Sequence, residues 1–416
     1  MTIRILSLHF YPDSSSTGNL LSDLALGLVK NGFNVEVFTS QPLDNIKNVC
    51  PKYEEYNKIK IFRLSNLRIN KHKKIGKVFN FLNYFFKTFF KVIFSSHNEN
   101  ILYLIVSNPP FLPIIGAMMS YLRNIHFIHI LHDIQPEESI NTNYVSSKSL
   151  YVKIWKFLNK YIYKKSSHII VLSDGMKKTV ENKLDKIYKG KKHKEKISII
   201  HNWADGEYLK PISFSDNVFI KQHNLENKFI INYSGNLGVY QKFDSILEVT
   251  KRLKNENIVF LFIGDGVKKN SMIKFKEDFG LNNVLFFPYL DKKILPHALT
   301  ASHLSIVHLE REIEGLAMPS KFYSILATGT PVLAFTRDGS DLQKIVIDAN
   351  CGCVVSHDDI DGIVDKIYKV KNVRNLQEEL GKNSRKYFEN NFTSKHAVVK
   401  YIDVINSVSG EYESTV

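Results

Sequence analysis

The sequence contains little cysteine and no uninterrupted hydrophobic segment of membrane-spanning length. Its 416 residues include only three cysteines, Cys50, Cys351 and Cys353. Three thiols cannot build a disulfide framework, so we expect a reducing compartment. The apolar run at the N-terminus is too short for a signal peptide. The chain also has no Walker loop, no Gly-x-Gly-x-x-Gly and no Ser/His/Asp set, which removes the sequence basis for several common enzyme classes.

The longest uncharged segment, residues 101–122, does not predict a membrane span. Ser107, Pro109, Pro110 and Pro113 interrupt it, and proline is not tolerated inside a helix. The pattern instead predicts a buried strand over 101–106, a proline turn, and a helix from about residue 113.

The positive charge is confined to the first half of the chain. Up to residue 205 there are 30 basic against 15 acidic residues, and from residue 206 onward 26 against 26. The whole formal excess of +15 therefore precedes residue 206. It could serve solubility alone, or attract nucleic acid, an anionic membrane or a phosphorylated substrate.

Residues 68–94 combine basic and aromatic side chains. Lysines beside aromatics on one helix are typical of an anchor that lies in the lipid headgroup plane. The alternative is an ordinary helix that packs its aromatics inward, and the sequence leaves both open. The residues expected to face the membrane are Lys73, Lys74, Lys77, Phe85, Phe89 and Lys91. This segment favours an anionic membrane surface over nucleic acid as the partner of the basic half.

Short apolar strands alternate with helical segments along the whole chain. The first half predicts strands over 3–8, 35–39, 101–106, 125–131, 168–172 and 197–200. The second half predicts strands over 229–233, 259–263, 284–287, 304–307 and 331–334. Apolar strands separated by helices indicate parallel sheets covered on both faces. The fold class is therefore α/β, with two doubly wound blocks joined by a linker near residues 205–217, and ligands are expected at the carboxyl ends of the strands.

Three loops that follow predicted strands could contact a phosphate or a nucleotide. Gly235 and Gly238 allow a close approach of the backbone, and residues 264–266 form a second glycine turn. The third loop, at residues 319–321, begins a helix. There the free amides of Ser320, Lys321 and Phe322, together with the Lys321 ammonium, suggest a diphosphate clamp. An ordinary structural turn is the alternative at each place.

Several other polar residues lie where they could have a catalytic, metal-binding or structural role. His132 and Asp133 follow the strand at 125–131, where they suit proton handling or hydroxyl orientation. His129 inside that strand reads as a core histidine. One Cys-x-Cys pair at 351–353 does not predict a zinc site, and Asp359 is expected to cap a helix rather than bind metal.

Taken together and in this order, these loops resemble the GT-B retaining glycosyltransferases of family 4. The chain is most similar to the bacterial branch that includes N-acetyl-L-fucosamine, colanic-acid and O-antigen transferases. The matching stretches are at 9–12, 17–18, 107–110, 132–137, 171–176, 201–205, 234–238, 262–266, 319–321 and 327–332. Asn-Trp-Ala-Asp at 202–205 and Pro-Ser-Lys at 319–321 are the most specific.

The resemblance implies a GT-B fold, with two Rossmann-like domains facing a central cleft. Residues 1–205 would bind the acceptor and residues 206–393 the nucleotide sugar, and a helix at about 394–407 would cross back to the first domain. His132 and Asp133 would face the transferred sugar. The residues implied to surround the donor are Thr17, Gly18, Gly235, Asn236, Gly238, Lys242, Gly264, Asp265, Ser320, Lys321 and Ser324.

The chain departs from this family at the usual pair of glutamates spaced Glu-x7-Glu. Aligned on residues 327–329, these positions hold Leu316 and Ser324. Ser324 or another group would then contact the ribose, and Glu314 could replace the first glutamate only if the loop shifts. The basic residue that usually follows the Gly-Asn-Leu-Gly loop is also displaced, and Lys242 is the nearest candidate.

The implied reaction moves a sugar, such as an N-acetylated deoxyhexosamine, from UDP or another nucleoside diphosphate to a lipid-linked, polyprenyl-diphosphate saccharide. It would serve O-antigen or capsule synthesis, without metal or other cofactor, by an enzyme at the inner face of the plasma membrane. Two alternatives remain: a UDP-sugar 2-epimerase on the same scaffold, and a non-enzymatic basic protein that binds membrane or nucleic acid.

Overall fold

The chain folds into two compact units, which are described separately. The computed structural model describes residues 1–13, 15–42, 50–65, 74–95, 100–188, 195–238 and 241–413. Unit 1 comprises Met1–Asn202, Gly315–Ala317 and Ser394–Val416, and unit 2 comprises Trp203–Glu314 and Met318–Thr393. Each unit is built around its own sheet, as the alternation of strands and helices predicts.

Unit 1 contains an eight-stranded sheet in the order β3-β4-β2-β1-β5-β6-β7-β8. All neighbours are parallel except β3, which pairs antiparallel with β4. Its central strands are continuous apolar runs because helices cover both faces of a sheet of this kind. The strands are β1 (Thr2–Leu6), β2 (Asn34–Ser40), β3 (Tyr53–Tyr56), β4 (Ile59–Leu64), β5 (Ile101–Val106), β6 (His126–Ile130), β7 (His168–Val171) and β8 (Ile197–Ile199).

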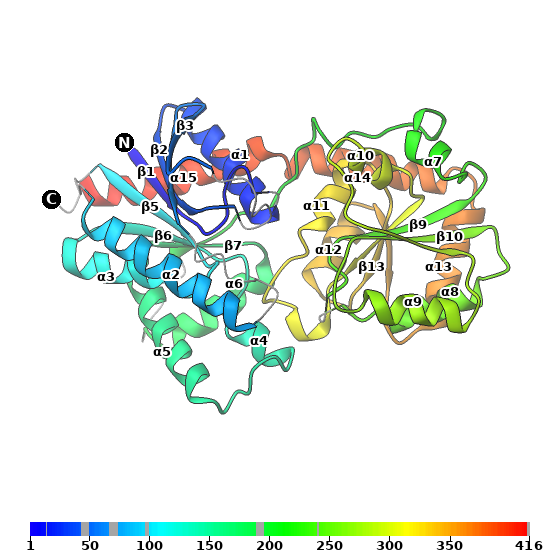
Figure 1. Ribbon diagram of the computed structural model, residues 1–416, viewed down its shortest axis with the longest axis horizontal. Helices are drawn as coiled ribbons and strands as arrows, with labels where there is room; N and C mark the ends of the chain where they lie inside the picture. The colour runs from blue at the N-terminus through cyan, green and yellow to red at the C-terminus, as the bar shows by residue number, and fades with distance from the viewer. Residues whose placement is uncertain are drawn as a thin grey trace. The chain divides into compact units, whose positions relative to one another are not determined.

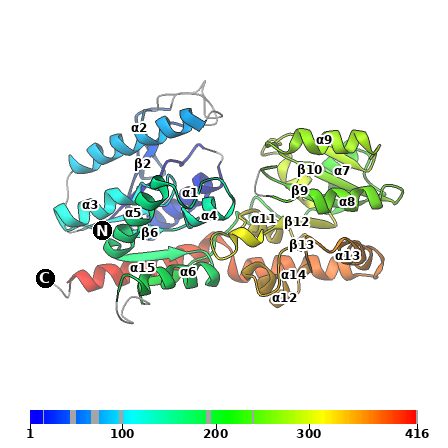
Figure 2. The same cartoon turned by 90° about the horizontal axis from the view of Figure 1, so that it is seen from below.

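The C-terminal helix belongs to unit 1 and packs against its first helix (Figures 1 and 2). Gly27 makes this close contact possible, since a Cβ there would lie 2.3 Å from a methyl group of Val398. The helices of unit 1 are α1 (Ser16–Lys30), α2 (Lys74–Ile93), α3 (Pro113–Arg123), α4 (Glu137–Asn141), α5 (Leu150–Lys165), α6 (Asp174–Asp185) and α15 (Ser394–Glu413).

Unit 2 contains a six-stranded, fully parallel sheet in the order β11-β10-β9-β12-β13-β14. The chain order of the strands reverses beside β9, and such a switch point is where ligands bind in open parallel sheets. The strands are β9 (Phe229–Ser234), β10 (Ile258–Ile263), β11 (Val284–Phe287), β12 (Leu304–His308), β13 (Val332–Phe335) and β14 (Gly352–Val355).

Helices cover both faces of this second sheet. In Figure 1, α7 and α10 lie on one side of it, and α8 and α9 lie on the other. The buried apolar side chains form separate clusters on the two faces. The helices of unit 2 are η2 (Phe214–Asp216), α7 (Val218–Gln222), α8 (Asp244–Arg252), α9 (Lys269–Asp278), α10 (Leu295–Thr300), η3 (Arg311–Ile313), α11 (Lys321–Ala327), α12 (Asp341–Asp348), α13 (Ile360–Asn372) and α14 (Leu376–Asn391).

Several local predictions are confirmed. The strand over 101–106 and the helix from Pro113 are both present. The Asp359 side chain caps α13 by accepting from Gly362 N, and His129 is 3% exposed in the core. The hairpin of β3 and β4 was not predicted. None of the described helices is both long and apolar enough to span a bilayer.

Candidate functional site

Two glycine loops at the carboxyl edge of the second sheet are hydrogen-bonded to each other. Gly235 N donates to Ile263 O at 2.9 Å, and Leu237 N donates to Asp265 O at the same distance. A Cβ at Gly264 would lie 2.1 Å from the carbonyl oxygen of Gly235. Since φ of Gly264 is also +139°, only glycine fits there. The glycines at 264 and 266 thus have a structural role. The sequence alone did not distinguish this role from ligand binding.

The Lys321 side chain reaches the first of these loops from the start of α11. A Cβ at Gly235 would lie 3.0 Å from the Lys321 Nζ, so the glycine leaves room for the ammonium. The same Nζ lies 3.6 Å from the centre of the Tyr233 ring, a cation–π distance. Burial lowers the pKa of Lys321 from 10.5 to about 7. Within the described ranges this ammonium makes no ion pair or hydrogen bond.

A small cavity adjoins Lys321. Its volume is about 150 Å³. Aliphatic side chains of α10, α11 and β12 form one part of its wall, and polar groups form the rest. The polar lining residues are Asn232, Ser234, Ser305, Lys321 and Ser324. Lys321 and Ser324, both predicted to contact the donor, thus line the same cavity.

The start of α11 differs in one respect from the prediction. Ser320 is exposed at the N-cap position and makes no side-chain capping bond. Phe322 N, however, donates to Pro319 O at 3.1 Å. The expectation of a free amide at Phe322 was therefore wrong, because the residues before the helix form a tight turn. The Lys321 ammonium is therefore the main group at the start of α11 that could contact a phosphate.

The other unit 2 residues that were predicted to surround the nucleotide sugar differ in how far their polar groups are free to bind it. The Asn236 side chain is exposed, while its carbonyl accepts from the Tyr233 hydroxyl at 2.9 Å. Gly238 N is already bound to Gln241 Oε1 at 3.1 Å. The exposed Asp265 accepts from its neighbour Gly266 N at 2.8 Å.

Lys242 is exposed but is held by two glutamates. Its Nζ lies 2.8 Å from Glu312 Oε1 and 3.8 Å from Glu310 Oε2. The hydrogen bond to Glu312 raises the pKa of Lys242. A phosphate would have to compete with Glu312 for this ammonium.

Leu316 and Glu314, the residues at and near the first position of the missing glutamate pair, lie in unrelated surroundings. Leu316 is buried in unit 1, where its carbonyl accepts from Ile134 N at 2.8 Å. Glu314 belongs to unit 2 and forms an ion pair with Arg337. It also accepts from Thr336 Oγ1 at 3.3 Å. Glu314 is thus anchored at the end of β13.

His132 and Asp133 lie in unit 1, just after β6. His132 N donates to Ser107 Oγ at 3.2 Å, and Asp133 forms an antiparallel bridge with Ala317. Burial lowers the pKa of His132 to about 4 and raises the pKa of Asp133 to about 6. The imidazole is therefore neutral at pH 7. Burial, together with the nearby Asp133, also raises the pKa of Glu138.

Thr17 and Gly18 lie in the first turn of α1 in unit 1. The Ser15 side chain caps this helix by accepting from Gly18 N at 3.1 Å. A Cβ at Gly18 would lie 3.0 Å from Asp13 O, so this glycine allows the tight entry into the helix.

The basic and aromatic segment forms helix α2, whose exposed face is apolar. The residues of that face are Phe79, Leu82, Phe86 and Phe90, each between 45% and 54% exposed. Phe85 and Phe89 are half-buried, and Lys91 is exposed with its Nζ 5.0 Å from the Phe62 ring centre. The opposite face buries Asn80, Tyr84 and Thr88. Lys73 and the side chains of Lys74 and Lys77 lie outside the described residues.

Sequence reasoning missed one cluster at the edge of the second sheet. His308, Glu310 and His357 are all buried there; His308 ends β12, and the other two residues follow β12 and β14. Burial lowers the pKa of both histidines, that of His308 to about 3. Their position at or near the carboxyl end of a strand was the only available signal, because nothing in their spacing along the chain brings residues 310 and 357 together.

Comparison with known proteins agrees with this architecture. Residues 215–387 match the family described as "Glycosyl transferases group 1". The chain is 25% identical to WbjE of Pseudomonas aeruginosa over 59% of its own length and 60% of the relative. It is 31% identical to WcaI of Escherichia coli over 32% and 34% respectively. Both are assigned provisionally as glycosyltransferases, the second in colanic acid biosynthesis. The matched region thus spans less than two thirds of either relative.

Solved structures are similar over nearly the whole chain. Sucrose-phosphate synthase from Thermosynechococcus elongatus has a TM-score of 0.75 at 17% identity, covering 99% of this chain and all of that one. HepE from Anabaena, solved with UDP and glucose, has a TM-score of 0.70 at 15% identity, covering 98% and 100%. These likenesses establish the GT-B fold. Residues 215–387 therefore match a group 1 glycosyltransferase model within a chain that has the GT-B fold, and the chain resembles bacterial transferases of the colanic-acid type.

Proposed function

We propose that this chain is a retaining glycosyltransferase for a lipid-linked saccharide in bacterial surface polysaccharide synthesis. The donor is a nucleotide-diphosphate sugar, with UDP as the nucleotide and an N-acetylated deoxyhexosamine as a candidate sugar. Unit 2 binds the donor and unit 1 binds the acceptor.

The observation that carries the proposal is the desolvated ammonium of the half-buried Lys321, which lies over Tyr233 and next to Gly235. A buried cation without an anionic partner costs free energy. A diphosphate beside Gly235 would supply the missing partner and would form a charge-assisted contact. The solved complex of HepE with UDP and glucose is consistent with this class of ligand.

In the proposed reaction the acceptor hydroxyl oxygen bonds to the anomeric carbon of the sugar while the bond from that carbon to the diphosphate breaks. Negative charge grows on the leaving nucleoside diphosphate, which takes up the hydroxyl proton. Lys321 stabilises that charge, and Lys242 adds a second cation once it is released from Glu312. No metal is needed for this role. His132 and Asp133 orient the sugar and the acceptor hydroxyl without covalent attachment.

The test is a transfer assay with the purified chain, a panel of UDP-, GDP- and dTDP-sugars, and polyprenyl-diphosphate saccharides. The expected result is nucleotide release that requires the acceptor. Release or sugar isomerisation without any acceptor would instead identify a 2-epimerase. The anomeric configuration of the product, measured by NMR, tests retention separately.

The exposed apolar face of α2 supports the membrane part of the proposal. Phe79, Phe86 and Phe90 recur at helical spacing, so they can enter the interface together. The basic excess of the first half of the chain favours anionic lipids. We therefore place the enzyme at the cytoplasmic face of the plasma membrane.

Vesicle sedimentation tests this placement. Phe86→Ser combined with Phe90→Ser should weaken binding to phosphatidylglycerol vesicles about 30-fold, because each ring is only 54% exposed in the free protein and so adds roughly 1 kcal/mol on insertion. Tyr289→Ser is the matched control, since that aromatic residue is 63% exposed but lies in unit 2. Equal binding by all three proteins would remove α2 from the proposal.

A further inference from the structure

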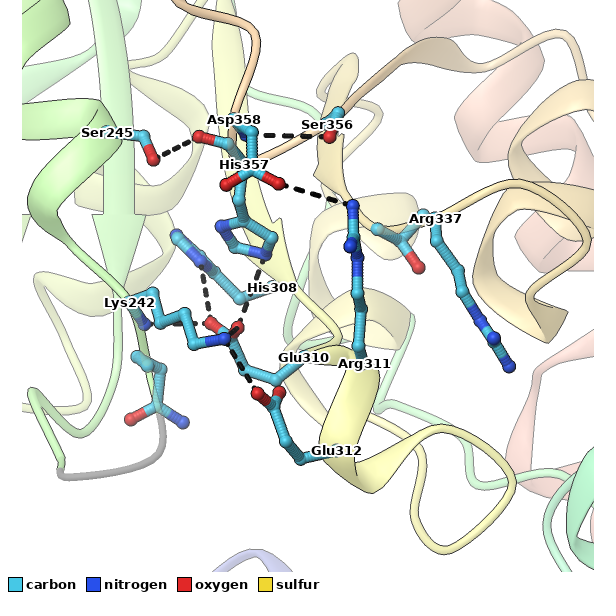
Figure 3. A network of polar contacts seen from close by, with 12 residues as sticks. Lys242, Ser245, His308, Glu310, Arg311, Glu312, Arg337, Ser356, His357 and Asp358 are labelled. Carbon is cyan, nitrogen blue, oxygen red and sulfur yellow. Dashed lines mark hydrogen bonds and ion pairs between the residues drawn. The ribbon is translucent and has the colours of Figure 1, made fainter. Parts of the chain in front are cut away.

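Three potential metal ligands meet at the carboxyl edge of the second sheet. His308 ends β12, Glu310 follows two residues later, and His357 follows β14. The parallel strand β13 lies between these two strands, so both loops leave the sheet at the same edge. In Figure 3 the two imidazole rings point toward the Glu310 carboxylate. The three residues are exposed by only 6%, 3% and 9% respectively.

This cluster is buried without completing its hydrogen bonds. Both ring nitrogens of His308, both of His357, and Glu310 Oε2 have no hydrogen-bond partner in the part of the chain that the structure describes. Leaving such groups unpaired is costly. His308 Nδ1 lies 3.6 Å from Glu310 Oε1, and His357 Nε2 lies 3.5 Å from Glu310 Oε2. Both distances are too long for a hydrogen bond.

The same distances suit two ligands that share an ion. Zinc binds nitrogen and oxygen at about 2.0–2.2 Å, which separates two tetrahedral ligands by about 3.4 Å. All three potential ligand atoms lie within 4.8 Å of one another. Two imidazoles with one carboxylate suit zinc and its neighbours in the first transition row, whereas magnesium and calcium prefer oxygen ligands.

The surrounding residues hold the ligands in place. Glu310 Oε1 accepts from Lys242 N at 2.8 Å. The His308 ring stacks on Phe335 with ring centres 4.8 Å apart. Such outer contacts fix the orientation of metal ligands. The Lys242 ammonium lies 3.8 Å from Glu310 Oε2 on the solvent side, and its side chain is 49% exposed, so it can move away as an ion enters.

We propose that His308, Glu310 and His357 bind one divalent transition-metal ion of the zinc class. The ion would tie the end of β12 to the loop after β14 and leave at least one coordination position for a ligand from outside the cluster. The ion has no step in the proposed transfer reaction, although Lys242 borders both sites.

The test measures metal binding directly on the full chain after dialysis against a chelator. Titration with Co²⁺ should give the visible absorption bands of a tetrahedral nitrogen–oxygen site, with one ion bound per chain, and Zn²⁺ should displace it. Zn²⁺ should also raise the melting temperature, because it binds only the folded state.

Glu310→Gln, His357→Gln and His308→Phe should each weaken Zn²⁺ binding at least about 100-fold. The first is isosteric, and the last keeps the aromatic stacking. His223→Gln, a histidine of unit 2 outside the cluster, is the control that should bind as the unaltered chain does. Absence of Co²⁺ bands and of a Zn²⁺-dependent melting shift in the folded, unaltered chain would overturn the proposal, as would unchanged binding in Glu310→Gln.

Discussion

Replacing Lys321 by methionine tests the most unusual electrostatic feature of unit 2. The folded state lowers the pKa of Lys321 from 10.5 to about 7. Between these two values the unfolded chain holds a proton that the folded chain has lost. The free energy of unfolding should therefore rise with pH from about 7 to about 10, and the cost of burying the ammonium is fully present below pH 7.

The magnitude follows from the size of the shift. At about 1.4 kcal/mol per pKa unit, the full shift corresponds to about 5 kcal/mol. Lys321 retains some exposure, so we expect about half of this value. Lys321→Met, which keeps the aliphatic stem, should be more stable than the unaltered chain by about 2 kcal/mol at pH 6.5, and the difference should vanish near pH 10.

Urea unfolding at pH 6.5, 8 and 9.5 measures this difference. Lys254→Met is the control, because Lys254 is an exposed lysine of the same unit and should leave the pH profile unchanged. If the profiles of Lys321→Met and the unaltered chain run parallel over this range, then the ammonium is not desolvated and the reasoning fails.

Three further predictions concern stability. Gly264→Ala should lower the free energy of unfolding in urea by at least about 3 kcal/mol, because its Cβ would overlap Gly235 O. Gly280→Ala is the control: it has positive φ but no neighbour within 4 Å and should cost about 1 kcal/mol. Equal costs would contradict the close approach of the two loops. Asp133→Asn should stabilise unit 1 by about 1 kcal/mol at pH 7.5 and not at pH 4. The pKa of Asp133 is raised in the folded state, so the unaltered chain loses stability as the pH rises from about 4 to about 6. A gain that is the same at both pH values would refute this prediction. Asp359→Ala should lower the free energy of unfolding by about 1 kcal/mol, because it removes the side-chain cap of α13. Asp358→Ala, at the exposed neighbouring position, is the control and should keep that cap.

The sequence predicted the fold because its apolar strands carry a strong and local signal. The run at residues 101–106 is apolar throughout and can only be buried on both faces, which places β5 inside a parallel sheet. The hairpin of β3 and β4 was missed because β3 has only four residues, Tyr-Glu-Glu-Tyr, and β4 alternates buried with more exposed residues, so neither strand forms a continuous apolar run.

The site was predicted less completely, because the spacing of residues along the chain does not determine their distances across the edge of a sheet. Lys321 was recognised from its position at a helix start, yet its contact with Tyr233 depends on how β9 and α11 pack. The tight turn at Pro319, which uses the Phe322 amide, depends on local backbone geometry. The meeting of His308, Glu310 and His357 required the strand order itself.

Binding of UDP to the full chain tests the central claim most directly. Isothermal titration at pH 6.5, where Lys321 is protonated, should give a measurable affinity for UDP. Lys321→Met should lose about 2–3 kcal/mol of binding free energy, or roughly 30- to 150-fold in affinity, because a charge-assisted phosphate contact is removed. Lys254→Met should bind as the unaltered chain does. Binding of UDP by Lys321→Met with unchanged affinity would contradict the account.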